Sequence, residues 1–254
     1  IGLSAADIIG HHFGPNSYEV LDYYNKVDEY LSNFISFLNQ SVGKDNYLLV
    51  LTSDHGVVPF PELSAEKGLD AKRISQSRFS LDINQIDKDL RHFYRLGEST
   101  ILKSSYKGIE PAFEYLNSKG VDSFEYLQKL RTELLKLPYI EETYDFFEIN
   151  EQSCKKPYMD LVRNSHSDNE GYFLKILAKE YYLIDMRDHG TTHGTPYSYD
   201  THVPLIWYGS ALKNEIINES VHTVDIAPTI LGYLGIQLDE KLSGRDLFNN
   251  SSNK

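Results

Sequence analysis

Residues 47–56, YLLVLTSDHG, give the strongest indication of the fold. Its first six residues are apolar apart from the closing threonine, a pattern typical of a strand covered on both faces in a parallel α/β sheet. The strand runs directly into Ser-Asp-His-Gly. Ligands gather at the carboxyl ends of strands in open α/β sheets, so we expect the loop over residues 53–56 to carry chemistry.

A long helix is predicted directly before this strand, over residues 16–43. Apolar side chains recur there at steps of three and four residues, which is the helical period. Asn16 and Glu19 have the spacing of a capping box, and Gly43 is suited to end the helix.

Hydrophobic patterning divides the whole chain into three segments. Residues 1–60 and 188–254 are expected to form the α/β core, because both contain short apolar strands beside helical patterns. Residues 61–187 read as an inserted subdomain or cap of mixed α and β structure. The smaller elements expected are a helix over 121–137, a hairpin joining 173–177 to 181–184, a strand over 204–208 and a helix over 223–234.

Length and composition narrow the class of protein. A chain of 254 residues with 41% hydrophobic and 24% charged residues suits one large globular domain or a core with an insertion, not a disordered or fibrous protein. The net charge of −12 repels phosphate backbones, so no nucleic-acid duplex is expected as partner. No apolar run approaches the ~18 residues of a membrane helix, so no transmembrane segment is expected. The lone Cys154 leaves no cysteine pair for a disulfide or a structural zinc.

Two clusters combine Asp with His beside a glycine. Asp7 and His11 are four residues apart, so on a helix they share one face and could bind one ion. Asp54 and His55 follow the central strand, where Gly56 frees the backbone and lets both side chains reach one point. The alternatives are an acid that caps a helix or turn and a solvated histidine.

A third cluster offers two histidines, His189 and His193. We favour His193, because residues 194–197, Gly-Thr-Pro-Tyr, form a rigid turn that could fix the imidazole ring. A metal ligand needs such an oriented support.

The donor types indicate the metal. Aspartate and neutral imidazole without thiolate suit Zn²⁺, with Mn²⁺ or Fe as weaker alternatives. Asp7, His11 and His193 would complete one site, and Asp54 with His55 would form part of a second. Two ions ~3.5–4 Å apart can stabilise the attacking and leaving oxygens of an in-line phosphoryl displacement. They would also supply the positive charge that an acidic protein needs to bind an anionic substrate.

The order of these motifs resembles the alkaline phosphatase superfamily. Within it, the chain is most similar to the type I phosphodiesterase/nucleotide pyrophosphatase group and the related bacterial single-chain alkaline phosphatases. The resemblance rests on D-x-x-G-H-x-F-G-P at residues 7–15, S-D-H-G at 53–56, T-H-G-T-P-Y at 192–197, Y-D-T-H-V-P-L-I-W-Y-G at 199–209, D-I-A-P-T at 225–229 and S-G-R-D-L at 243–247. It implies a partial three-layer α/β/α sandwich with a mostly parallel sheet and a mixed α+β insertion.

The resemblance also implies how the site works. The family motif matching Asp7, His11 and His193 binds one zinc, and the motif matching Asp54 and His55 binds the other. The family's Thr or Ser nucleophile precedes the D-x-x-x-H motif, so we expect this chain to be the C-terminal part of the enzyme, to lack the nucleophile and to be inactive alone. The implied substrate is a small phosphate ester or nucleotide, and the implied location is periplasmic or secreted.

Two other functions stay open from the sequence. One is a non-catalytic module that uses the same residues to bind metal or a partner. The other is a phosphoryl-group transferase on the same scaffold, in which an alcohol in place of water accepts the group.

Overall fold

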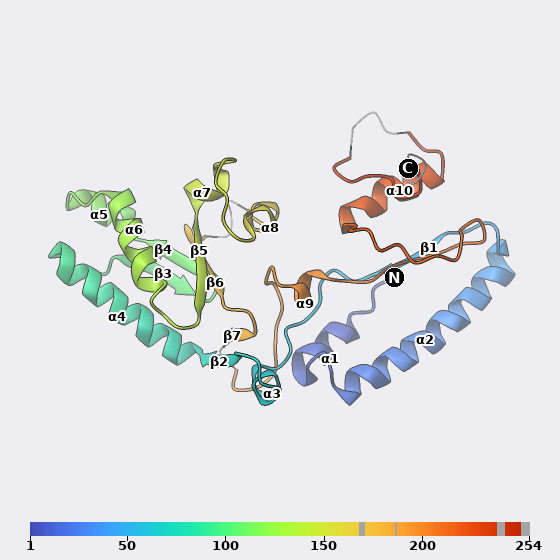
Figure 1. Ribbon diagram of the computed structural model, residues 1–254, viewed down its shortest axis with the longest axis horizontal. Coiled ribbons are helices and arrows are strands. Elements are labelled where there is room, and N and C mark those ends of the chain that lie inside the picture. Colours follow the sequence, from blue (N-terminus) through green and yellow to red (C-terminus); the bar gives the residue numbers. More distant parts are fainter. Residues whose placement is uncertain (168–170, 186, 238–241, 250–254) are drawn as a thin grey trace. The chain divides into compact units, whose positions relative to one another are not determined.

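The computed structural model describes residues 1–167, 171–185, 187–237 and 242–249. Contacts within the chain define two compact units, which are described separately. The first contains Ile1–Asp28 and His55–His202, and the second contains Glu29–Asp54 and Val203–Lys254. Figure 1 labels the elements along the chain.

Two helices open the chain, α1 (Ala5–Phe13) and α2 (Tyr18–Leu38). The prediction of a helix over residues 16–43 is confirmed, since α2 continues into a π-helical turn, η1 (Asn39–Gly43). The predicted capping residue is wrong by one position. The Ser17 hydroxyl, not the Asn16 side chain, accepts a hydrogen bond from the Val20 N–H at 3.2 Å and caps the helix.

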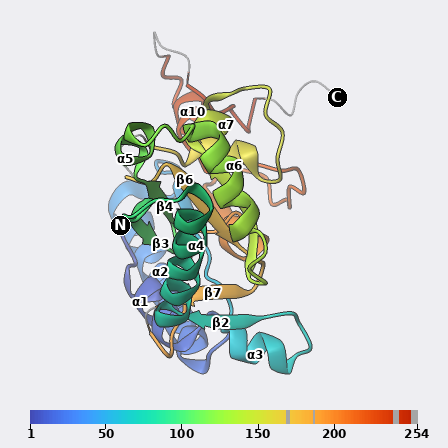
Figure 2. The ribbon, with the colours of Figure 1, turned by 90° about the vertical axis from the view of Figure 1, so that its left-hand side faces the viewer.

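The segment 61–187 lies within the first unit. Its elements are α3 (Pro61–Glu66), β2 (Lys72–Ser75), α4 (Gln76–Tyr94), β3 (Ile101–Ser105), β4 (Gly108–Pro111), α5 (Phe113–Ser118), α6 (Ser123–Leu134), β5 (Ile140–Asp145), α7 (Phe146–Asn150), α8 (Met159–Asn164), β6 (Leu174–Ala178) and β7 (Tyr182–Asp185). Four of the strands form an antiparallel sheet of order β3-β4-β6-β5. Helices α4 and α6 lie side by side (Figure 2) and share a hydrophobic core with this sheet, in which Phe79, Leu130 and Leu174 are fully buried.

The hairpin predicted between residues 173–177 and 181–184 is wrong. Both strands form, as β6 and β7, but they do not pair with each other. β6 lies between β4 and β5, whereas β7 pairs in parallel with β2. The chain leaves β6 through Tyr181 in the left-handed conformation, with φ of 62°, and the next strand joins a different sheet. Apolar patterning specifies that a strand forms, not which strand it pairs with.

The second unit contains the strand predicted over residues 47–52. It forms as β1 (Leu49–Thr52) and pairs antiparallel with β8 (Leu205–Tyr208), so within the described residues its partner is not a parallel strand. Residues of both strands are half-buried or exposed, in contrast to the two-sided burial that the sequence predicted.

A helical turn and a helix follow in the same unit, η3 (Thr223–Asp225) and α10 (Ile226–Tyr233), which confirms the helix predicted over residues 223–234. The buried Asp225 carboxylate accepts hydrogen bonds from the backbone N–H groups of His222 and Arg245, both at 2.9 Å. These bonds tie the segment after the helix back to its start.

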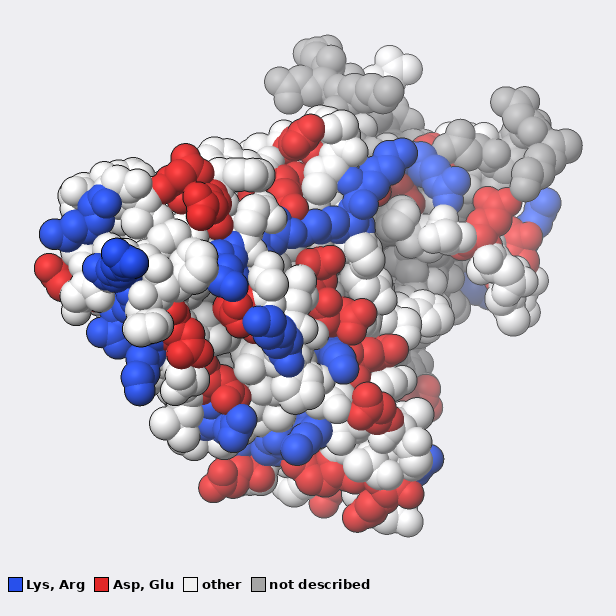
Figure 3. Space-filling view, turned by 60° about the vertical axis from the view of Figure 1, so that its left-hand side comes forward, with Lys and Arg blue, Asp and Glu red and all other residues white. Residues whose placement is uncertain are grey.

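Surface charge is mixed on the face shown in Figure 3, where Lys and Arg side chains are interspersed with Asp and Glu. None of the helices among the described residues is both long and apolar enough to cross a membrane.

Candidate metal centre

Helix α1 presents Asp7 and His11 on one face, as their spacing predicted. His11 Nε2 lies 3.4 Å from Asp7 Oδ1. Gly10 beside His11 is buried, and a Cβ there would lie 3.4 Å from the Val57 side chain. The helix therefore packs closely against the loop that follows His55.

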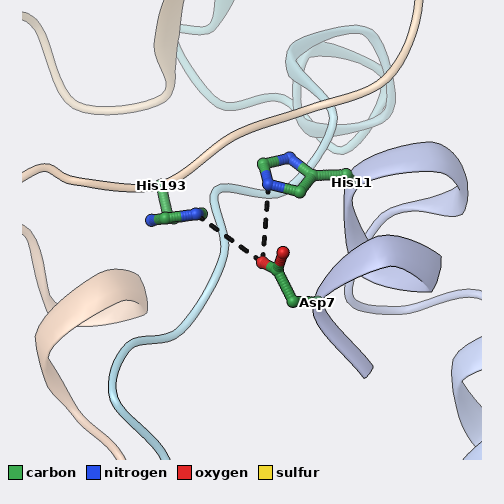
Figure 4. A group of neighbouring side chains, drawn as sticks. All are labelled: Asp7, His11 and His193. Atoms are coloured by element: carbon green, nitrogen blue, oxygen red, sulfur yellow. Dashed lines mark ion pairs between the residues drawn. The ribbon is translucent and has the colours of Figure 1, made fainter. Parts of the chain in front are cut away.

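His193 reaches the same carboxylate from a loop far along the chain, between β7 and α9 (Ser198–Thr201). His193 Nε2 lies 3.6 Å from Asp7 Oδ1, and its ring centroid is 5.1 Å from that of His11 (Figure 4). The donor atoms of Asp7, His11 and His193 all lie within 4.8 Å of one another. The other candidate in this loop, His189, is exposed to solvent.

The spacing of these donor atoms suits a tetrahedral ion better than it suits hydrogen bonds. Asp7 Oδ1 is buried and has no hydrogen-bond partner in the part of the chain that the structure describes, although two imidazole nitrogens lie 3.4 and 3.6 Å away. Ligands held at 2.0–2.1 Å around a tetrahedral zinc lie about 3.3 Å from one another. The three residues therefore fit a zinc ion, which would satisfy the unpaired oxygen.

His55 joins this cluster from the loop after β1. Its Nε2 lies 4.0 Å from Asp7 Oδ1, and its ring stacks on that of His193 with centroids 3.4 Å apart and planes 11° apart. Asp54, the residue before His55, belongs to the second unit, where its Oδ1 accepts a hydrogen bond from the Ser53 hydroxyl at 3.5 Å.

The ring of His11 is oriented by Thr191. His11 Nδ1 lies 2.6 Å from the Thr191 carbonyl oxygen, and the Thr191 N–H donates to the His11 carbonyl at 2.8 Å. A carbonyl oxygen can only accept a hydrogen bond, so Nδ1 of His11 carries a proton. In the neutral tautomer with this proton, Nε2 holds the free lone pair. That lone pair faces Asp7, which is the tautomer a metal ligand requires.

The loop that carries His193 is also held from its other sides. The fully buried Thr191 donates its hydroxyl hydrogen to the Val58 carbonyl at 2.6 Å, and the Val58 N–H donates to Thr192 at 3.0 Å. Arg73 donates to the Gly190 carbonyl at 2.8 Å while it forms two bonds to Glu62, of 2.7 and 3.0 Å.

Gly190 adopts φ of 84°, and a Cβ there would lie 2.9 Å from the His11 carbonyl oxygen. A side chain at this position would therefore strain the backbone and crowd the helix that carries His11.

Sequence reasoning did not identify Thr191 or Arg73 as supports. Thr191 directly precedes the T-H-G-T-P-Y motif, which was a usable signal. Arg73 lies in the inserted segment, and its contact with Gly190 has no local pattern.

The environment favours the neutral form of His193. Burial, followed by the nearby His55 ring, lowers the pKa of His193 below its ordinary value of 6.5, although Asp7 acts in the opposite direction. The ring is therefore neutral at pH 7 and offers its nitrogen lone pair to a metal.

Comparison with solved structures defines the class of fold. The chain superimposes on wild-type alkaline phosphatase PafA with a TM-score of 0.81 and 28% identity, over 97% of this chain and 46% of that one. Human ectonucleotide pyrophosphatase/phosphodiesterase 5 gives a TM-score of 0.59 at 19% identity over 94% of this chain and 54% of that one, which is a likeness of fold. The expected α/β fold of the alkaline phosphatase type is thus confirmed, with mixed sheets and helices.

The family follows from the sequence. The family model described as type I phosphodiesterase/nucleotide pyrophosphatase matches residues 2–128, and the chain belongs to this family, whose members are phosphoric ester hydrolases. The resemblance seen in the motifs is therefore confirmed.

Curated relatives agree with this assignment. Alkaline phosphatase PafA of Elizabethkingia meningoseptica is 29% identical over 249 residues, which cover 97% of this chain and 44% of that protein. Alkaline phosphatase PhoV of Synechococcus elongatus is 26% identical over 249 residues, or 93% of this chain and 42% of that protein. The chain thus spans less than half the length of these relatives.

Proposed function

We propose that this chain supplies the metal-binding part of a two-zinc phosphate-ester hydrolase of the phosphodiesterase/nucleotide pyrophosphatase or alkaline phosphatase type. The observation that carries the proposal is the buried Asp7 Oδ1, which forms no hydrogen bond among the described residues and which two imidazole nitrogens approach at 3.4 and 3.6 Å. An unpaired buried oxygen needs a partner, and a cation bound by the same three residues would be one.

Each residue has a role in this proposal. Asp7, His11 and His193 hold one zinc, and His55 with Asp54 contributes to the second. Bound zinc supplies Lewis-acid stabilisation of the oxygens in a phosphoryl displacement and activates the attacking oxygen. The protein's part is to orient the imidazoles, which Thr191 does for His11 through the 2.6 Å contact to Nδ1.

Zinc is preferred to manganese or iron because the donors are two imidazoles and one carboxylate, and the imidazole nitrogens lie 3.4 and 3.6 Å from the carboxylate oxygen. Manganese favours a larger, oxygen-rich octahedral set.

The remaining parts of the proposal follow from the family. The nucleophile is a Thr or Ser outside these 254 residues, and the substrate is a small phosphate ester or nucleotide. The protein is periplasmic or secreted.

Activity of the complete protein tests this function. We expect it to hydrolyse p-nitrophenyl phosphate or bis-p-nitrophenyl phosphate, to lose activity on chelation and to recover it with zinc. His11→Ala should lower kcat/KM by at least about 100-fold, since loss of a ligand exceeds the effect of its supports.

The adjacent His12 is exposed and provides the matched control. His12→Ala should leave kcat/KM within twofold of wild type. Equal effects of the two substitutions would contradict the proposed site, and zinc binding without hydrolysis of either ester would indicate a non-catalytic module. Transfer of the phosphoryl group to an added alcohol in place of water would identify a transferase.

The 254-residue chain alone gives a second test. Groups that act as one catalytic unit fail together when one is missing, so we expect turnover at least ~10³-fold below that of the complete protein. Full-rate turnover by the 254 residues would disprove the external nucleophile.

A further inference from the structure

We propose that Asp200 is a positioning residue that fixes the spacing between the His55 and His193 rings, an inference that rests on the proposed function. Asp200 lies in the short helix α9 (Ser198–Thr201) and is only 4% exposed. A buried carboxylate is costly unless its hydrogen bonds compensate, so its partners indicate what it does.

The carboxylate holds the turn that follows His193. Asp200 Oδ2 accepts hydrogen bonds from the Thr195 N–H and the Thr195 hydroxyl, both at 2.7 Å. Charge-assisted bonds of this length are among the stronger ones in proteins. They fix Thr195, which is joined to His193 through Gly194 alone.

The backbone of the same residue holds the turn that follows His55. The Asp200 carbonyl accepts a hydrogen bond from the Gly56 N–H at 2.8 Å. The approach is so close that a Cβ on Gly56 would lie 2.0 Å from the Tyr199 carbonyl oxygen. The segments after both histidines therefore meet at one residue, through its side chain and through its carbonyl group.

Helix α9 is itself anchored to the sheet of the first unit. Tyr197, the residue before the helix, is 4% exposed, and its hydroxyl donates to the Ala178 carbonyl in β6 at 2.7 Å. Asp200 therefore holds the two loops against a fixed support. The result is the parallel stacking of His55 and His193 with ring centroids 3.4 Å apart.

The second carboxylate oxygen is less well satisfied than the first. Asp200 Oδ1 is buried and forms no hydrogen bond of standard geometry among the described residues. A similar Asp–Thr pair occurs away from the cluster. Asp87 Oδ1 accepts from the Thr100 N–H at 2.8 Å and from its hydroxyl at 2.6 Å, and Asp87 Oδ2 lies 3.2 Å from Arg91 Nε.

The test measures zinc affinity of the complete protein by competition with a chromophoric chelator, and records the visible spectrum of the cobalt-substituted protein. Asp200→Ala should raise the zinc dissociation constant 10- to 100-fold, the usual effect of losing a residue that orients metal ligands. It should also change the cobalt spectrum. Asp200→Asn keeps an acceptor for both Thr195 bonds and should stay within threefold of wild type.

Asp87→Ala is the matched control, because it removes the same kind of Asp–Thr pair from the core of the inserted segment. It should lower the melting temperature and leave the zinc dissociation constant unchanged. If Asp200→Ala does not fold, Thr195→Val removes the Thr195 hydroxyl, and with it the bond to Asp200 Oδ2 and the 3.4 Å bond from the Tyr197 N–H, but keeps the bond from the Thr195 N–H to Asp200. This variant should weaken zinc binding severalfold.

Two results would overturn the assignment of Asp200. One is unchanged zinc affinity in every folded variant at Asp200 and Thr195, and the other is a loss in Asp200→Asn equal to that in Asp200→Ala. A wild-type protein that binds no zinc would overturn the proposed function instead, so the two failures are distinguishable.

Discussion

Gly56 shows how one residue sets the approach of two loops. A Cβ at this position would lie 2.0 Å from the Tyr199 carbonyl oxygen, so the backbone must shift to accommodate it. We expect Gly56→Ala to cost about 1–3 kcal/mol of unfolding free energy. It should also weaken zinc binding, because His55 precedes the displaced residue. Chemical denaturation and zinc titration measure the two effects.

Gly97 is the control for this substitution, since it is exposed and a Cβ there would have no atom within 4 Å. Gly97→Ala should change stability by less than about 0.5 kcal/mol. If both alanine variants behave alike, the close approach at Gly56 has no energetic importance.

The hydroxyl group of Thr191 holds the loop that carries His193 against Val58. Thr191→Val keeps the shape of the side chain but leaves the Val58 carbonyl without its 2.6 Å hydrogen bond. We expect a loss of about 1–3 kcal/mol in unfolding free energy, together with weaker zinc binding. Thr191→Ser retains the hydroxyl and should recover most of the zinc affinity. Calorimetry of both variants, with and without zinc, checks this, and equal zinc affinity in wild type and Thr191→Val would refute it.

The proximity of Asp7 and His11 could be predicted from sequence, but the contacts that support the candidate site could not. Asp7 and His11 are four apart on a helix, so their proximity follows from the helical period. The bonds from Thr191 to Val58 and from Arg73 to Gly190 join residues more than a hundred positions apart. Such contacts depend on the packing of distant segments, which local spacing does not encode.

Among the elements, α7 (Phe146–Asn150) begins with a capping box that is tied into a charge cluster. Glu148 accepts hydrogen bonds from Lys156 at 2.9 Å, Arg131 at 2.8 Å and the Asp145 N–H at 3.2 Å. Burial alone raises the pKa of Glu148, but these partners outweigh it and lower the pKa below its ordinary value of 4.5.

This shift predicts how stability depends on pH. Because the folded-state pKa is lowered, the contribution of Glu148 is fully present above pH 4.5 and is lost as the pH falls through the folded-state pKa. Glu148→Gln should therefore cost about 1–2 kcal/mol at pH 7, and the difference from wild type should shrink on acidification. Urea unfolding from pH 7 to pH 3 measures this. Glu141 is exposed on β5 and provides the control; a Glu148→Gln effect that grew with acid would contradict the account.

Sequence patterning predicted which helices and strands form, but not how the strands pair. Helices α2 and α10 were predicted because a helix satisfies its own backbone and its period is local. Strands β6 and β7 were also predicted, but as a hairpin. In the structure, β6 pairs with β4 and β5, and β7 pairs with β2. These partners are distant in sequence, so the pairing depends on how the hydrophobic core is assembled.

For the whole molecule, the order of the motifs along the chain predicted the fold better than composition did. A net charge of −12 and 254 residues describe many globular proteins. The ordered motifs indicated an α/β fold of the alkaline phosphatase type, which the superposition on PafA at a TM-score of 0.81 confirms. The sequence did not reveal that β1 pairs antiparallel with β8, because an apolar strand reads the same with either kind of partner.

Zinc affinity of variants in the 188–194 loop tests whether residues from distant parts of the chain bind one zinc ion, as proposed. His193→Ala removes a proposed ligand, whereas His189→Ala removes an exposed histidine of the same loop. We expect a zinc dissociation constant at least about 100-fold higher for His193→Ala and one within threefold of wild type for His189→Ala. Unchanged affinity in His193→Ala, or an equal loss in His189→Ala, would contradict the shared zinc site.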